Sequence, residues 1–216
     1  MHDNPLMRIA VFGATGRVGT RLIKEALARG YSVAAYARSP QKIAVVHPKL
    51  LIVQGGLEDK DKIEEAVKGA DVVVSVMGPV GRQDKLIFSP AYESIVQAMK
   101  KHGVKRIIAL GTPTIPDDND GFSLIFWSLI VVVGFIIRKG HEDIRTVGTI
   151  LRKSGLDWTL VRVPLLTNGR KRGRVTVGYF GNGVEWPWVS RADFVDFLLE
   201  QLTSNTYIGK APAISN

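Results

Sequence analysis

Short apolar runs alternate along the chain with stretches whose apolar residues repeat at helical spacing. The run at 8–12 ends at Gly13, and in the following segment Leu22, Ile23, Ala26 and Leu27 recur every three or four positions. The first pattern predicts a buried strand and the second an amphipathic helix. The same patterns predict strands over 8–12, 31–37, 50–53, 71–77, 104–110 and 158–163, and helices over 18–29, 60–68, 90–102, 144–153 and 192–202.

This alternation predicts an α/β fold: a doubly wound, Rossmann-like parallel sheet with helices on both faces. A small C-terminal extension is expected on the substrate side. The 216 residues suit a single domain. Sheets of this kind bind ligands outside the carboxyl ends of their strands. We therefore expect the functional residues to follow strands.

The composition excludes several classes of protein. There is no cysteine, so neither a disulfide-stapled domain nor a cysteine-bound structural zinc is possible. No pair of histidines has metal-ligand spacing, and we expect no metal site. The N-terminal residues 1–5 lack a basic region followed by an apolar run, so no signal peptide is predicted and a cytoplasmic location is expected.

Positive charge is concentrated in one window. The chain has a net charge of +9, and residues 138–174 hold ten basic side chains against three acidic ones. Such a window attracts an anionic ligand, a membrane surface or nucleic acid, or it is a solvated face. The basic run 170–174 has no aromatic platform or recognition helix beside it, so we interpret it as a surface loop and expect no nucleic acid partner.

A glycine-rich loop follows the first predicted strand and opens the first helix, with the spacing Gly-x-x-Gly-x-x-Gly. Its first glycine permits a tight turn, its second lets backbone approach a pyrophosphate, and its third allows close packing of helix on strand. The helix N-terminus then faces the phosphates. The predicted cofactor-binding residues of this loop are Gly13, Thr15, Gly16, Arg17, Val18 and Gly19.

The end of the second strand indicates which dinucleotide binds. Enzymes that use NAD often have an acidic residue there for the ribose hydroxyls, whereas arginine accommodates a 2′-phosphate. Here the strand is followed by Arg38 and Lys42, with no acidic residue between them. The sequence therefore favours NADP(H) over NAD(H).

Four segments carry a family resemblance: 11–16, 98–106, 151–162 and 189–193. On these residues the chain resembles the atypical short-chain dehydrogenase/reductases with an NAD(P)-binding, NmrA-like domain, and among them the biliverdin reductase B/flavin reductase type. The resemblance covers nearly the whole chain. It implies a Rossmann core, NADP(H) as ligand, and a substrate pocket above the nicotinamide.

The resemblance also implies further cofactor contacts. Gly56 and Leu57 match a pair that touches adenine, although the usual Asp is replaced by Gly56 here. Met77 and Gly78 match a loop beside the ribose. Further contacts near the nicotinamide carboxamide are implied for Pro164 and Leu165.

The catalytic centre departs from the common short-chain pattern. None of the five tyrosines has a lysine four residues on, so the usual Tyr-x-x-x-Lys proton relay is missing. The resembling type uses a serine after the fifth strand, and Thr112 occupies that position. Thr112 is able to hydrogen-bond a carbonyl or the nicotinamide amide, or it simply caps the strand end. The family's histidine near the sixth-strand loop is Leu165 here.

Residues 122–137 form an apolar segment without charge. As a helix it would span about 24 Å, short of a hydrocarbon core of about 30 Å. We interpret residues 113–143 as an apolar substrate lid or contact segment; a peripheral membrane contact through 122–139 and a dimer interface are the alternatives. As a lid it implies a bulky hydrophobic substrate. The predicted substrate contacts are Pro113, Phe122, Phe126 and Trp127.

His141 and Glu142 follow this segment. They either enter the pocket as acid/base groups or lie, with Asp143, at a helix N-terminus where acids are favourable. The second interpretation is favoured, and His141 remains a candidate catalytic residue.

Taken together, these features predict an NADP(H)-dependent reductase acting on a hydrophobic small molecule such as a carbonyl, enone, quinone or flavin-like compound. Two alternatives remain. One is a non-enzymatic regulator that senses NADP(H). The other is an isomerase, cyclase or dehydratase of secondary metabolism without net redox chemistry. A monomer or a homodimer is expected.

Overall fold

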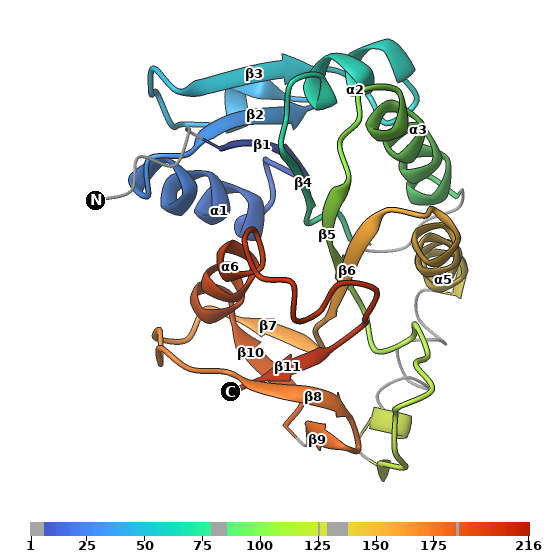
Figure 1. The fold of residues 1–216 in the computed structure, drawn as a ribbon. Helices are drawn as coiled ribbons and strands as arrows, with labels where there is room; N and C mark the ends of the chain where they lie inside the picture. The colour runs from blue at the N-terminus through green and yellow to red at the C-terminus, as the bar shows by residue number, and fades with distance from the viewer. Residues whose placement is uncertain (1–6, 79–85, 125, 129–137, 185) are drawn as a thin grey trace.

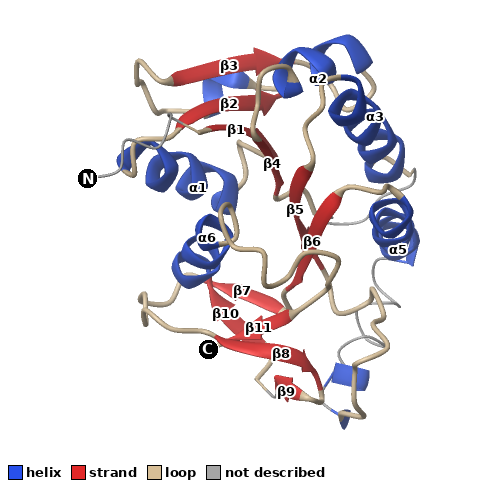
Figure 2. Cartoon of the chain, in the orientation of Figure 1, coloured by secondary structure: helices blue, strands red, loops and turns tan. Residues whose placement is uncertain are grey.

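A twisted sheet forms the centre of the molecule (Figures 1 and 2). The computed structural model describes residues 7–78, 86–124, 126–128, 138–184 and 186–216. Six parallel strands stand in the order β3-β2-β1-β4-β5-β6. Their bounds are β1 Arg8–Phe12, β2 Ser32–Ala37, β3 Leu50–Gln54, β4 Val72–Ser75, β5 Arg106–Gly111 and β6 Asp157–Arg162. The predicted doubly wound sheet is confirmed.

Helices cover both faces of the sheet. Helices α1 (Arg17–Ala28) and α6 (Arg191–Glu200) pack on each other over one face. Helices α2 (Lys60–Val67), α3 (Phe88–Lys101) and α5 (Arg138–Lys153) cover the other. Successive β1 residues divide between the two layers: Ile9 and Val11 join the core with α1 and α6, and Ala10 and Phe12 the core with α2, α3 and α5. This double burial explains why the strands read as continuous apolar runs.

The predicted start of α5 at Ile144 needs correction. Within the described residues this helix already begins at Arg138, so Glu142 and Asp143 lie beyond its first turn. The interpretation of these acids as favourable N-terminal charges on α5 is therefore wrong. The side chain of Asp143 instead points to another helix, as shown below.

Beyond β6 the sheet continues with strands that the sequence did not predict. Strand β11 (Ala213–Ser215) pairs parallel to β6, and β8 (Thr176–Phe180) pairs antiparallel to β11. The short β9 (Gly183–Val184) follows at the edge. A separate two-stranded sheet joins β7 (Leu165–Thr167) and β10 (Trp188–Ser190). These strands form the expected C-terminal extension, at the lower end of Figure 1.

A buried arginine ties this extension to the sheet. Arg162 ends β6 and its side chain is fully buried. It forms a two-pronged ion pair with Asp120, with Nη–Oδ distances of 2.6 and 2.7 Å. It also donates to the carbonyl oxygens of Ile115 and Ala211, and its guanidinium lies 4.9 Å from the ring centre of Phe180. One side chain thus fixes the loop after β5, the segment before β11, and β8.

The apolar segment 122–137 falls largely outside the described residues. Leu124 and 126–128 are helical, and Phe126 is buried against Phe180 with ring centres 4.4 Å apart. In the described ranges, no helix combines the length and hydrophobicity needed to span a bilayer.

Candidate cofactor site

The glycine loop follows β1 at the carboxyl edge of the sheet. Gly13 has φ +82°, and a Cβ there would stand 2.9 Å from the carbonyl carbon of Val76. A Cβ on Gly19 would stand 2.1 Å from the carbonyl oxygen of Gly13. Both positions therefore require glycine: the first for the turn and the approach to β4, the second for packing α1 on the loop.

The start of α1 presents unused donors. Gly16 is the N-cap, with no side-chain hydrogen bond to cap the helix and no acidic residue in the first turn. Thr15, Gly16 and Arg17 are exposed. Because the first N–H groups of a helix have no partner within it, this end carries partial positive charge and attracts an anion.

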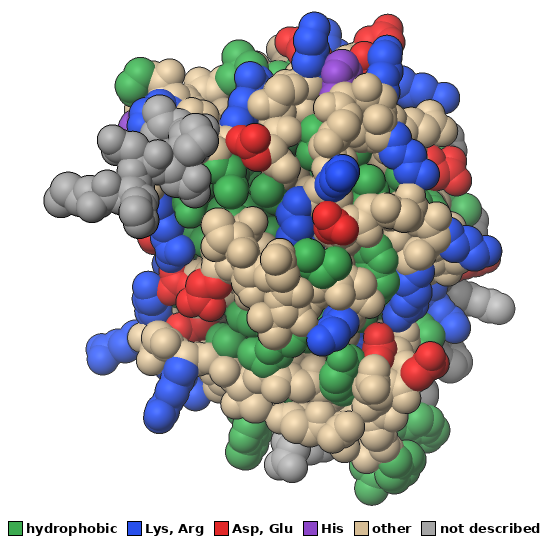
Figure 3. All heavy atoms as spheres, in the orientation of Figure 1, with side chains coloured by type: hydrophobic (Ala, Val, Ile, Leu, Met, Phe, Trp, Pro, Cys, Tyr) green, Lys and Arg blue, Asp and Glu red, His purple; other side chains and the backbone are tan. Residues whose placement is uncertain are grey.

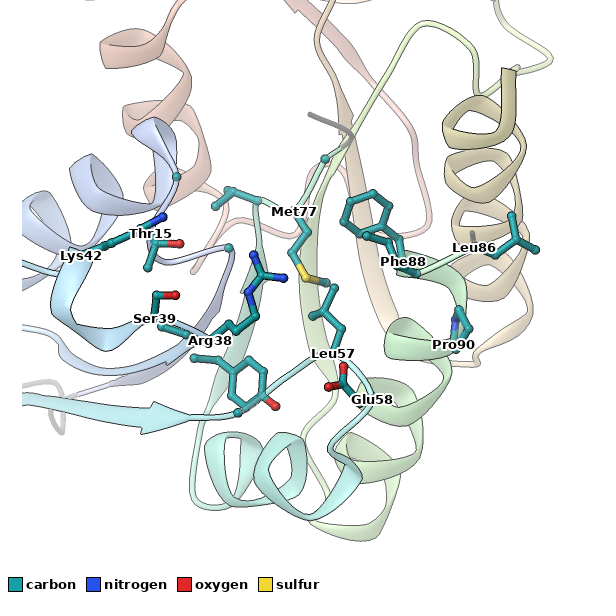
Figure 4. Close-up of a pocket in the computed structure, with 18 residues that line it drawn as sticks. Thr15, Arg38, Ser39, Lys42, Leu57, Glu58, Met77, Leu86, Phe88 and Pro90 are labelled. Carbon is teal, nitrogen blue, oxygen red and sulfur yellow. The ribbon is translucent and has the colours of Figure 1, made fainter. Parts of the chain in front are cut away.

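A cleft of about 570 Å³ opens beside this loop. On one side Arg38, Ser39 and Lys42 follow β2, close to Thr15, and the Arg38 guanidinium extends toward the middle of the cleft (Figure 4). Met77 and Gly78 follow β4, and Leu57 and Glu58 follow β3. The lining residues are Gly13, Thr15, Gly16, Tyr36, Ala37, Arg38, Ser39, Lys42, Gly55, Leu57, Glu58, Val76, Met77, Gly78, Leu86, Ile87, Phe88 and Pro90.

Tyr36 holds the loop after β3 in place. Its hydroxyl donates to the carbonyl oxygen of Gly56 at 2.6 Å. A Cβ on Gly55 would meet this hydroxyl at 2.3 Å, so the bond depends on a glycine there. Burial, together with the nearby charges of Asp59 and Glu58, raises the pKa of Tyr36 to about 12. Tyr36 is therefore a neutral structural donor at neutral pH.

The opposite wall of the cleft is the start of α3, and Asp143 fixes it from α5. The buried carboxylate accepts hydrogen bonds from the backbone N–H groups of Ile87, Phe88 and Ser89 at 2.7 to 2.8 Å. These are helix-terminal donors that have no partner inside α3. A residue 54 to 56 positions away thus caps the helix and positions the apolar wall.

Comparison with known proteins identifies the family. A family model described as NAD(P)H-binding matches residues 13–205. This chain belongs to that NAD(P)H-binding family. The match begins at the first glycine of the loop that opens the cleft.

Several curated relatives of this family member are named reductases or dehydrogenases. A (4-alkanoyl-5-oxo-2,5-dihydrofuran-3-yl)methyl phosphate reductase of Streptomyces griseus is 30% identical over 71% of this chain and 46% of the relative. A 3β-hydroxysteroid dehydrogenase/Δ5→4-isomerase of Mycobacterium tuberculosis is 29% identical over 82% and 58%. The chain thus spans about half to three-fifths of these relatives' length.

Solved structures agree on the fold. A short-chain dehydrogenase/reductase of Veillonella parvula in complex with NADP superposes with a TM-score of 0.82 at 19% identity, covering 97% of this chain and 94% of that chain. ChuY, an anaerobillin reductase of Escherichia coli O157:H7, superposes at 0.73 with 20% identity, covering 97% of both chains. At these identities the likeness shows the architecture alone.

Eight of the predicted cofactor residues line the cleft of this NAD(P)H-binding protein: Gly13, Thr15, Gly16, Arg38, Lys42, Leu57, Met77 and Gly78. Val18 and Gly19 lie buried beneath the loop and shape it from below. The cleft lining does not include Arg17, Gly56, Thr112, Pro164 or Leu165.

Sequence reasoning missed the start of α3 and its partner Asp143. The apolar residues 86–88 were not recognised as a wall because nothing local in the sequence places them opposite the glycine loop. Asp143 follows another acid, Glu142, in an otherwise basic stretch, and the sequence alone favours placing both at the N-terminus of their own helix.

Thr112 follows β5, and its hydroxyl pairs with that of Thr114 at 2.7 Å. No described carboxylate or imidazole is shown bonded to either hydroxyl. Burial raises the pKa of Tyr36, Tyr92 and Tyr179, so none of these three tyrosines is activated as an acid. Tyr92 is fully buried and donates to Ser75.

The predicted substrate contacts Pro113, Phe122, Phe126 and Trp127 are not among the residues that line the cleft. Phe122 and Trp127 are strongly exposed, and Phe126 is buried against Phe180. Pro113 is half-buried in the loop after β5. The side chain of His141 lies outside what the structure describes. Among the described residues, no group of three or more His, Cys, Asp or Glu is placed to hold a metal ion.

Two arginines approach each other at the rim of the glycine loop. Arg17 begins α1 and Arg191 begins α6, and the two helices are in contact. Burial, and then the charge of Arg17, lowers the pKa of Arg191. Arg191 also donates to the side chain of Asn168 at 2.7 Å. This corner of the site is therefore electropositive.

Proposed function

We propose that the protein is an NADP(H)-dependent reductase of a hydrophobic small molecule. The observation that carries this proposal is the placement of Arg38, Ser39 and Lys42 in the same cleft as the glycine loop. Two cations and a hydroxyl suit a 2′-phosphate, which carries charge and several acceptor oxygens. An acidic residue, the usual partner of an unphosphorylated ribose, is absent from this position.

The donor set fits a dinucleotide. The N–H group of Gly16 already donates to the carbonyl oxygen of Gly13 at 3.1 Å. The N–H groups of Thr15 and of the first turn of α1, with the side chains of Arg17 and Arg191 nearby, would hold the pyrophosphate. Leu57 would pack against adenine. The family's Asp is replaced by Gly56, and a Cβ at this position would meet the carboxylate of Glu58 at 2.3 Å. Met77 and Gly78 would border the ribose. Thr112, Pro164 and Leu165 are proposed for the nicotinamide end.

When bound, NADPH would supply a hydride from C4 of its nicotinamide. The chain's part is to hold the substrate carbonyl or alkene above that carbon in the correct geometry. Thr112 would donate a hydrogen bond to the substrate oxygen or the nicotinamide amide, with Thr114 orienting its hydroxyl. An unactivated hydroxyl is a weak acid, so the proton would come from water.

The proposed substrate is bulky and largely apolar. Leu86, Ile87 and Phe88 give the cleft an apolar wall opposite the cations. One relative is named for reduction of an alkanoyl-dihydrofuranone that carries a phosphate, and another for dehydrogenation and isomerisation of a 3β-hydroxysteroid; both substrates contain an apolar part built on a ring. The finer relationship to the biliverdin reductase B/flavin reductase type is part of this proposal.

The alternative of an NADP(H)-sensing regulator is favoured by one observation, the unassisted Thr112–Thr114 pair. NADPH oxidation against a panel of quinones, flavins, enones and tetrapyrroles separates the two functions. The reductase turns over at least one panel member, and Thr112→Val slows that turnover. NADPH binding without turnover on any member favours the regulator.

A further inference from the structure

Three of the four tryptophans of this chain stand on the surface. Trp127, Trp186 and Trp188 have 60, 59 and 39% of their area exposed, whereas Trp158 has 9%. A large aromatic side chain in contact with water gains free energy when a partner covers it. Isolated exposed apolar residues need no explanation, but a group of them does.

The first group sits on the edge of the extended sheet. The backbone N–H of Gly121 donates to the carbonyl oxygen of Phe180 at 2.8 Å, and Phe126 packs into a small cluster with Phe180, Val184 and Ala213. Phe126 anchors the segment, and its neighbours Phe122, Leu124 and Trp127 therefore point outward, with 80, 67 and 60% exposed.

The second group follows β9 directly. Trp186 and Trp188 pack ring against ring with centres 5.5 Å apart. Trp188 is in register with Leu165 of β7, which is half exposed. We call the two groups together the aromatic end: Phe122, Leu124, Trp127, Leu165, Trp186 and Trp188. Its residues belong to β7 and β10 or flank β9, and these strands lie in the lower half of Figure 1.

A basic loop adjoins this end. Residues 170–174 connect β7 to β8, and Arg170, Lys171, Arg172 and Arg174 are exposed. Asp193 fixes the loop by accepting from the N–H groups of Arg172 and Gly173. Figure 3 shows hydrophobic side chains along the lower edge of the molecule and lysine and arginine side chains at its lower left.

We infer that the aromatic end binds an anionic lipid surface. Tryptophan favours the membrane–water interface, where its ring is buried and its N–H remains hydrated. The negative potential of anionic headgroups attracts arginine side chains that lie beside the apolar residues inserted in the membrane, and this attraction strengthens binding. A second copy of this chain fits less well, because a two-fold interface would bring two basic loops together in a protein of net charge +9.

Lipid binding at this place would put the loops after β5 and β6 at the bilayer. A reductase of hydrophobic molecules would then take its substrate from the membrane rather than from water. The lipid contact itself is independent of the cofactor, so it stands or fails separately from the proposed reductase.

The test is co-sedimentation of the full chain with phosphatidylcholine vesicles containing 0 to about 40% phosphatidylglycerol, together with intrinsic tryptophan fluorescence. We expect binding that increases with anionic lipid and decreases with salt, and a blue shift on binding. Trp127→Ser/Trp186→Ser is expected to weaken binding about tenfold or more. Its control is Val46→Ser/Leu51→Ser, which removes exposed apolar residues around β3.

Two double variants that reverse charge test the contribution of the basic loop. Arg170→Glu/Arg174→Glu should abolish the dependence on phosphatidylglycerol, whereas Lys68→Glu/Lys105→Glu makes the same change in net charge at exposed sites near α2 and β5. Equal loss in both charge variants, or equal loss in both apolar variants, would overturn the proposal. The proposal would also be overturned if the protein does not bind vesicles and sediments as a dimer at equilibrium, and if Trp127→Ser/Trp186→Ser makes it a monomer.

Discussion

Around the cofactor cleft, residues close in sequence build the structure, whereas the aromatic end is held by polar side chains that reach across the chain. The turn after β1 depends on Gly13 and Gly19, six positions apart. The loop before the aromatic end depends on Arg162 and Asp120, which are 42 positions apart. Local steric requirements leave a sequence motif, and long-range ion pairs do not.

The largest effect on stability is expected when the long-range ion pair between Arg162 and Asp120 is removed. Arg162→Met leaves Asp120 without its cationic partner and should lower the free energy of unfolding by about 3–5 kcal/mol. Arg152→Met removes a partly exposed ion pair to Asp117 and should cost less than about 1 kcal/mol. Urea unfolding followed by circular dichroism measures both. Similar costs for the two variants would show that Arg162 does not organise the extension.

Two alanine variants in the glycine loop test whether local steric requirements build the cofactor cleft. Gly19→Ala brings a Cβ to 2.1 Å from the Gly13 oxygen and should cost about 1–3 kcal/mol as well as weaken NADPH binding more than tenfold. In Gly16→Ala the nearest atom is 3.3 Å away, so the fold should be nearly as stable as the wild type. Thermal unfolding and calorimetry separate stability from affinity. Equal melting temperatures for the two variants would be inconsistent with this geometry.

Asp143 is a long-range polar contact that acts at the cofactor cleft. It lies far along the chain from the start of α3, yet it positions this wall of the cleft. Asp143→Asn replaces one carboxylate oxygen by a donor that faces backbone N–H groups, and should lower stability by about 1–3 kcal/mol. Glu142→Gln, an exposed neighbour, should change it by less than about 0.5 kcal/mol. Hydrogen exchange at residues 87–89 should increase in Asp143→Asn alone; unchanged exchange would exclude the capping role.

The smallest expected effect depends on pH. Asp193 is buried, which opposes its ionisation, but hydrogen bonds from Ser190, the N–H groups of Arg172 and Gly173, and Asn216 hold its pKa below the ordinary value of 3.8. A carboxyl with a lowered pKa stabilises the fold above the unfolded value and loses this contribution as pH falls through the folded value. Stability should therefore decline below about pH 4, and less steeply in Asp193→Asn. Parallel pH profiles of the two proteins would contradict this role.

The sequence predicted the parallel sheet well because each strand and helix has its own periodicity, as in 8–12 and 18–29. It also predicted eight residues that line the cleft, since glycines and cations follow β1 and β2 directly. It failed for β7 to β11, which are two to five residues long and include exposed positions. The roles of Asp143 and Phe126 were also hidden, because both depend on partners far along the chain.

Cofactor choice is the central question, and titration calorimetry with NADPH and NADH in one buffer answers it most directly. We expect micromolar NADPH binding, NADH at least tenfold weaker, and a loss of this preference in Arg38→Ala/Lys42→Ala but not in the control Lys68→Ala. Equal affinity of the wild type for the two dinucleotides, or binding of neither, would contradict the role assigned to Arg38 and Lys42.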